Sequence, residues 1–271
     1  MTAFGPRMLR SLGPWATALM VTLAQPGVAD SPDSPPPADA VITADAPATA
    51  AVLQPFTVNY RVNVSKIPTP IRATLTLTEA GDDQYRMGLA VKSMLMDNSE
   101  QSLFQWRNCQ PHTLTYQHDF EGFRRERHHR MTFNWDTLRV SGHSSADDEG
   151  QDDFDYSITE DTLDELTMLL KARCIMQEGV SQYQLTSAYG KRLRTHFIHV
   201  VGEETMNTPL GRLRTIKFEK RRDQDSKRRT IFWLAPDLDY LLVRARHVEG
   251  TGLFGELKMT GYDGPYNALK K

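Results

Sequence analysis

The sequence predicts a mostly β protein, in which a large antiparallel curved sheet, half-barrel or barrel-like, carries one covering α-helix. Apolar and polar residues alternate with a period of two from Phe56 onward, as in the run from Phe56 to Val64. Turn residues such as Gly81-Asp82-Asp83 separate these runs, and one segment has a helical period instead. One apolar and one polar face per strand is typical of an antiparallel sheet that is solvated on one side.

The alternation predicts about a dozen strands, a number that suits one large barrel, half-barrel or sandwich. We therefore expect a single β-rich domain over residues 54–268. Its predicted strands are Phe56–Val64, Ile71–Leu77, Tyr85–Val91, Leu114–His118, Phe123–Trp135, Leu138–Val140, Tyr183–Tyr189, Leu193–Val201, Leu213–Arg221, Thr230–Leu234, Leu241–Val248 and Leu257–Met259.

The segment from Thr159 to Arg173 is predicted to be the helix. Thr159 can cap it, four acidic residues fill its first turns, and Lys171 and Arg173 lie at its end, as the helix dipole favours. Its apolar side chains recur at spacings of three and four. We expect this helix to cover one open face of the sheet, or to act as a plug or lid over a cavity.

The first 29 residues resemble a secretory signal peptide. Arg7 and Arg10 precede an uncharged, apolar stretch, and Gly27-Val28-Ala29 predicts cleavage after Ala29. The apolar run is shorter than the ~20 residues of a spanning helix, although an uncleaved anchor is the alternative. Residues 30–53, with five prolines, are predicted to form a disordered linker. The protein is thus expected to be periplasmic, exported and soluble after cleavage.

Charge and cysteine content exclude two further classes of protein. The formal net charge of −2 gives no general attraction to nucleic acid, so no nucleic-acid partner is expected. Cys109 and Cys174 are too few for a disulfide-rich scaffold. In an oxidising compartment they are expected to pair, and two buried free thiols are the alternative.

No catalytic residue, metal site or cofactor is predicted. Gly142-His143-Ser144-Ser145-Ala146 resembles a nucleophile elbow, but we expect an acidic loop between Ser144 and Asp155 where the elbow requires a helix. His128 and His129 are predicted to point to opposite faces of one strand, and so are His196 and His199. Neither pair has the spacing of a metal site.

The basic segments offer the candidate ligand-binding residues. Alternation places Arg125 and Arg127 on one strand face with Phe123, Met131 and Phe133. A second basic segment, from Lys217 to Arg229, is predicted to be a hairpin. Solvated strand faces are one interpretation. The other is a cationic rim that holds a phosphate or carboxylate headgroup beside an apolar trough.

Several segments together resemble the bacterial family DUF 3108, an uncharacterised exported domain. The resemblance rests on Phe56-Thr57-Val58-Asn59-Tyr60, on Thr208-Pro209-Leu210-Gly211 with the following strand, and on Trp233-Leu234-Ala235-Pro236-Asp237. It implies a mostly β domain of unassigned function and supplies no catalytic residues. By analogy of fold it suggests the curved half-barrels of periplasmic lipoprotein carriers.

These observations favour a non-enzymatic protein of the cell envelope, in which the curved sheet binds a lipid or other amphipathic ligand, or an acylated envelope protein partner. An envelope hydrolase acting on glycan or lipid is the second hypothesis, and it requires two convergent carboxylates or a Ser–His pair. A structural assembly factor that recruits partners through exposed strand edges is the third.

Overall fold

This computed structural model describes residues 52–269, apart from residues 66, 82, 95, 123–124 and 147–149. The predicted signal peptide, almost all of the predicted linker and the candidate residue Phe123 therefore lie outside the described residues. Leu53, the last residue of the predicted linker, is buried in the core.

In the described residues, fourteen strands form one antiparallel sheet that does not close into a barrel, and the predicted curved sheet with one helix is confirmed. The chain makes two meanders, β1 to β8 and β9 to β14, and the pairing of β1 with β14 joins them. Strands β8 and β9 form the two ends of the sheet. The strands are β1 (Phe56–Val64), β2 (Ile67–Gly81), β3 (Gln84–Lys92), β4 (Met96–Arg107), β5 (Gln110–Gly122), β6 (Arg125–Asn134), β7 (Arg139–Ala146), β8 (Gly150–Ser157), β9 (Gln182–Tyr189), β10 (Arg192–Thr208), β11 (Gly211–Arg221), β12 (Arg229–Ala235), β13 (Leu241–Val248) and β14 (Phe254–Asp263).

Two of these strands, β4 and β8, were not predicted. The inward positions of β4 include Asn98, Glu100 and Ser102, so the strand lacks the apolar alternation on which the prediction relied. Strand β8 lies in the segment predicted to be an acidic loop, and that prediction was wrong because β7 and β8 form a hairpin there. The supposed nucleophile elbow is likewise an ordinary part of β7.

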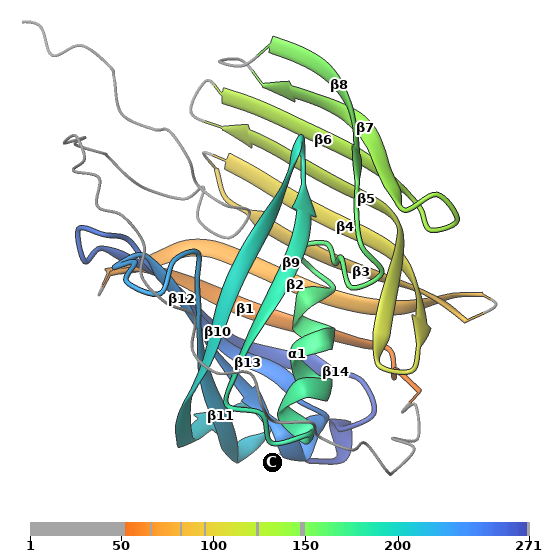
Figure 1. Ribbon diagram of the computed structural model, residues 1–271. Helices are drawn as coiled ribbons and strands as arrows, with labels where there is room; N and C mark the ends of the chain where they lie inside the picture. Colours follow the sequence, from red (N-terminus) through yellow and green to blue (C-terminus); the bar gives the residue numbers. More distant parts are fainter. Residues whose placement is uncertain are drawn as a thin grey trace, which may run out of the picture.

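Helix α1 (Met168–Gln177) lies inside the curve of the sheet (Figure 1). The helix begins and ends later than predicted. Residues 159–167, which were predicted to be its first turns, instead pair with β9 and form the turn that precedes the helix. The backbone of Leu163 pairs with β9, accepting from Ala188 N–H at 2.8 Å and donating to Thr186 at 3.0 Å. Two residues on, the chain turns into the helix, and Leu166 and Leu170 are buried in the core. The helix therefore fills the interior rather than covering it from outside.

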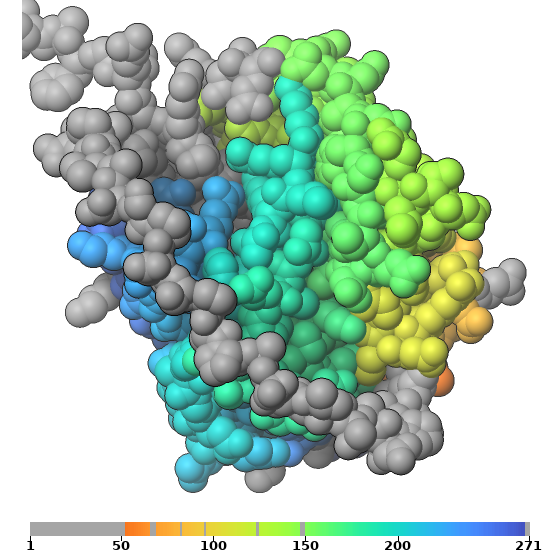
Figure 2. All heavy atoms as spheres, in the orientation of Figure 1, coloured from red at the N-terminus to blue at the C-terminus, as the bar shows by residue number. Residues whose placement is uncertain are grey.

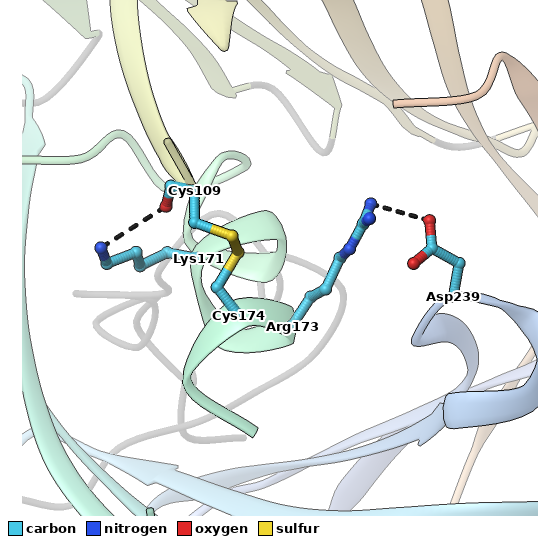
Figure 3. The surroundings of a disulfide bond; sticks show 5 residues. All are labelled: Cys109, Lys171, Arg173, Cys174 and Asp239. Atoms are coloured by element: carbon cyan, nitrogen blue, oxygen red, sulfur yellow. Dashed lines mark hydrogen bonds and ion pairs between the residues drawn. A yellow bond between two sulfur atoms is a disulfide. The ribbon is translucent and has the colours of Figure 1, made fainter. Parts of the chain in front are cut away.

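The end of α1 is fastened to opposite walls of the sheet (Figure 3). The predicted disulfide between Cys109 and Cys174 joins it to the β4–β5 turn. Arg173 donates across 2.8 Å to Asp239, which follows the 3-10 helix η1 (Pro236–Leu238). Cys109 and Asp239 both have positive φ angles, near 60°, so each tight turn aims its side chain at the helix.

The two ends of the sheet meet without forming a ladder. Tyr156 of β8 donates to the carbonyl of Gly190, in the β9–β10 turn, at 3.0 Å, and Lys191 forms an ion pair with Asp152. Figure 2 shows the atoms of β9 and β10 (teal) directly beside the green segment that contains β8. Side-chain contacts thus join the two ends of the sheet, although no ladder forms between them. Among the described residues, no helix has the length and apolar character needed to cross a membrane.

The disulfide is expected to stabilise the fold strongly. The Cys109→Ser/Cys174→Ser variant should lose about 4 kcal/mol of unfolding free energy, because the bond closes a loop with a sequence separation of 65. Urea unfolding of the variant, beside the parent with and without reductant, measures this. Equal midpoints for oxidised and reduced parent would contradict the prediction.

The buried position of α1 makes it part of the core. Its amides should exchange with solvent as slowly as those of β1 and β14, and Leu166→Ala should cost about 2–5 kcal/mol. Leu193→Ala, at a position 40% exposed, is the control and should cost far less. Fast exchange confined to α1 would instead identify it as a lid.

Candidate functional site

Polar and charged side chains occupy the middle of the interior, where a core is normally apolar. They come from both meanders and from the segment that precedes α1. We call this set the interior polar network; it comprises Asn98, Glu100, Ser102, Thr113, Tyr116, His118, His129, Asp164, Glu165, Ser187, Tyr189, Arg194, His196 and Lys220.

Asp164 is the anchor of α1 in this network. Its carboxylate accepts hydrogen bonds from Ser102 at 2.5 Å and Thr113 at 2.6 Å, and from the backbone N–H groups of Leu166 and Thr167. It therefore caps the chain as it enters the helix and fixes that point to β4 and β5. Burial raises the pKa of Asp164, while these hydrogen bonds oppose the shift. A fully bonded carboxylate of this kind has a structural role.

Glu165 is a buried carboxylate shared among several donors. Ser187 donates to it at 2.9 Å and Lys220 at 3.2 Å. His196 and Arg194 lie at 3.4 Å and 3.5 Å. Burial alone would raise the pKa of Glu165, but Lys220 and His196 outweigh it and hold the pKa well below its usual range. Glu165 is therefore an anion inside the sheet.

Glu100 has the opposite character. One carboxyl oxygen, Oε2, accepts from the Tyr116 hydroxyl at 2.7 Å, and the other, Oε1, has no partner among the described residues. Burial raises the pKa of Glu100 to about 8, and the charges of Glu165 and Asp164 add to the effect. Glu100 is thus a neutral acid at pH 7, and the interior holds two carboxyl groups in different protonation states.

Two buried histidines connect the meanders. His118 bonds to Asn98 at 2.8 Å and to the Tyr189 hydroxyl at 3.0 Å, and the His129 ring meets Tyr189 edge to face at 4.8 Å. Burial lowers the pKa of each histidine to about 3, and nearby positive charges contribute. Both rings are therefore neutral, and they pack the tip of the β9–β10 hairpin against the first meander.

Three arginines gather beside this contact, and we call Arg127, Arg194 and Arg222 the seam cations. Arg194 is 10% exposed and its guanidinium lies 3.7 Å from the centre of the Tyr189 ring, while its Nε atom has no hydrogen-bond partner among the described residues. Partial burial and the nearby Arg194 lower the pKa of Arg222. Arg127 and Arg194 both act electrostatically on Tyr189 and His129. The seam therefore has a positive potential.

The described part of β6 has the predicted alternation, while Phe123 lies outside the described residues. Met131 and Phe133 are buried and alternate with exposed residues, and Arg125 and Arg127 share their face at the half-buried end of the strand. The sequence did not indicate that Arg194 and Arg222 lie near Arg127, because they belong to the other meander. It also did not single out Glu100 and Glu165. The one available signal was the polar alternation of Asn98, Glu100 and Ser102.

A Ser–His pair does occur, but its geometry differs from that of a nucleophile. Ser187 Oγ lies 2.8 Å from His196 Nε2, and Glu165 contacts the same nitrogen rather than the opposite side of the ring. A catalytic triad requires the acid at the other ring nitrogen. Ser187 is moreover completely buried. Within the described residues, no group of three or more His, Cys, Asp or Glu side chains is arranged to hold a metal ion.

The raised pKa of Glu100 predicts a measurable pH dependence. The unfolded carboxyl ionises near pH 4.5 and the folded one near pH 8, so the unfolded state binds fewer protons between these values. The contribution of Glu100 to stability should therefore fall as pH rises, by up to about 1.4 kcal/mol per pH unit, and the comparison with Glu100→Gln isolates it from the opposite contribution of the buried histidines. Glu100→Gln cannot ionise, so its stability relative to the parent should increase steadily from about pH 5 to pH 8.

Urea unfolding at several pH values tests this, with Glu121→Gln at an exposed position of β5 as the control. The control should show a constant difference from the parent. A constant difference for Glu100→Gln as well would mean that Glu100 is ionised in the folded protein.

Comparison with known proteins identifies a family and a similar fold. No curated protein matches the chain. Among solved structures, it is similar to a beta-barrel-like protein of the domain of unknown function DUF1849 from Brucella abortus. The TM-score is 0.53 at 10% identity, over 78% of this chain and 98% of that one, so the similarity concerns the fold alone. The model of the family DUF3108, described as a protein of unknown function, matches residues 56–260, and the chain therefore belongs to the DUF3108 family.

Proposed function

We propose that this protein is a non-enzymatic binder of an acidic amphipathic ligand in the cell envelope. The seam cations hold the anionic headgroup, and the inner face of β6 receives part of the apolar body. The observation that carries this proposal is the excess of positive charge at the seam. The disulfide is compatible with an exported protein.

The ion pairs of the described residues indicate this excess of positive charge. Glu165 is shared by the two cations Arg194 and Lys220, while Glu100 is neutral. No described residue forms an ion pair with Arg127 or Arg222. Arg127 is half-buried and Arg222 is exposed, so both can reach an anion bound at the seam. Guanidinium groups suit carboxylate and phosphate because they can donate two parallel hydrogen bonds.

Buried apolar side chains lie next to the cations. Phe120 of β5 is directly opposite Arg127 in the ladder and is buried, and Met131 and Phe133 continue the same face of β6. A ligand with a charged head and an apolar body matches this arrangement of cations beside apolar side chains. The hydrolase hypothesis has less support, because Ser187 is enclosed and lacks the geometry of a nucleophile.

Lipid selectivity tests the proposal. The parent protein should bind vesicles of phosphatidylglycerol at least about tenfold more tightly than vesicles of phosphatidylcholine, which corresponds to about 1.4 kcal/mol. Arg127→Ala/Arg222→Ala should lose most of this preference, because it removes two cations that form no ion pair with a described residue.

The matched control is Arg61→Ala/Arg72→Ala, two arginines paired across β1 and β2 at exposed positions. It removes the same net charge and should keep the preference. Flotation or native mass spectrometry provides the measurement. Equal binding of the two lipids by the parent, or equal loss in both double variants, would refute a seam site.

A further inference from the structure

A second feature lies away from the seam, beside the fastened end of α1. A small cavity of about 50 Å³ opens between the helix, the inner faces of β2 and β3, and the turn that leads into β13. Its walls are mostly aliphatic and include Leu77, Leu170 and Leu242. Among the described residues, the charged side chains that line it are Arg173 and Asp239.

Arg173 is the unusual member of this lining. It is 4% exposed, and one of its nitrogens, Nη1, donates to Asp239 at 2.8 Å. Its Nε atom is buried and has no hydrogen-bond partner among the described residues. A guanidinium can donate two parallel hydrogen bonds to a carboxylate from the edge that includes Nε, and Nε has no partner among the described residues.

Asp239 is a replaceable partner. Its side chain is 29% exposed, and both Asp239 and Tyr240 have φ angles of 58°, a conformation that residues other than glycine adopt only when their surroundings hold them in it. If another carboxylate took Arg173, Asp239 could turn to solvent without leaving a buried charge. The ion pair thus places a partly exposed acid in the lining of an apolar cavity.

Leu53 fills the space next to it. This side chain is 1% exposed, although it belongs to the irregular segment ahead of β1. Leu53 and Gln54 line the cavity on one side, and Pro265 and Tyr266, which follow β14, line it on another. Segments outside the sheet therefore form part of the wall, and withdrawal of Leu53 would enlarge the cavity without disturbing the ladder.

We propose that this cavity is a binding site for an aliphatic monocarboxylate, that is, a free fatty acid. The carboxylate bonds to the Nε atom of Arg173 and displaces Asp239 from the same guanidinium, and the first part of the chain occupies the volume now filled by Leu53. A single guanidinium and a narrow apolar space match one carboxylate better than a phosphodiester, whose additional oxygens would lack donors. The site is separate from the seam cations and does not depend on them.

Calorimetric titration of the full chain with dodecanoate and dodecanol at pH 8 tests the site, because the two probes differ only at the head. The parent should bind dodecanoate at least about tenfold more tightly than dodecanol. Leu53→Ala should tighten dodecanoate binding severalfold, whereas Val52→Ala, at a neighbouring position 63% exposed, should leave it unchanged. Equal binding of acid and alcohol by the parent would overturn the proposal.

Two further variants test the roles of the Arg173 and Asp239 charges in binding. Arg173→Met should abolish the preference for the acid. Should that variant not fold, Asp239→Asn remains informative, because it weakens the internal competitor and should tighten dodecanoate binding, whereas a purely structural ion pair would leave the affinity unaltered. Arg127→Ala/Arg222→Ala should bind dodecanoate as the parent does. Failure of the seam proposal is thereby distinguished from failure of this one, and an unaltered affinity in Asp239→Asn would refute the exchange of carboxylates.

Discussion

A curved sheet of fourteen strands encloses more space than its own side chains can fill, and the need to fill it governs this structure. Helix α1 provides the filling, but a ten-residue helix has little stability of its own. It is therefore held at both ends. Asp164 binds its start to β4 and β5, while the disulfide and Arg173 bind its end to two turns on opposite walls.

Holding the start of the helix brings acidic residues into the interior, and the electrostatics of the site follow from that. Glu165 enters beside Asp164 and is compensated by groups from β9, β10 and β11. The compensation is more than sufficient, because two cations share this one anion while Glu100 stays protonated. The surplus of positive charge at the seam is thus linked to the way in which the helix is anchored.

The strands with apolar inward residues could be predicted from the sequence, and all of them are present. Strands β4 and β8 could not, because their inward or exposed positions are polar, and polar alternation does not distinguish a strand from a loop. The bounds of α1 were wrong because Leu163 pairs with β9 and Asp164 binds Ser102 and Thr113, and both contacts depend on residues distant in the chain. The cysteine pair was predicted from compartment rather than geometry. The face of Arg127 was correct, but the other seam cations come from the second meander, which local patterns cannot place.

The pairing of β1 with β14 has a consequence for how the chain reaches this structure. The first and last strands form the middle of the sheet, so that ladder has to wait until the whole domain has been synthesised. The disulfide, by contrast, joins residues that both precede β9, and it can form while β1 still has an open edge. The first meander and its helix can therefore assemble as a cross-linked folding unit on which the later strands complete the sheet, and during that interval the edge of β1 is exposed to aggregation.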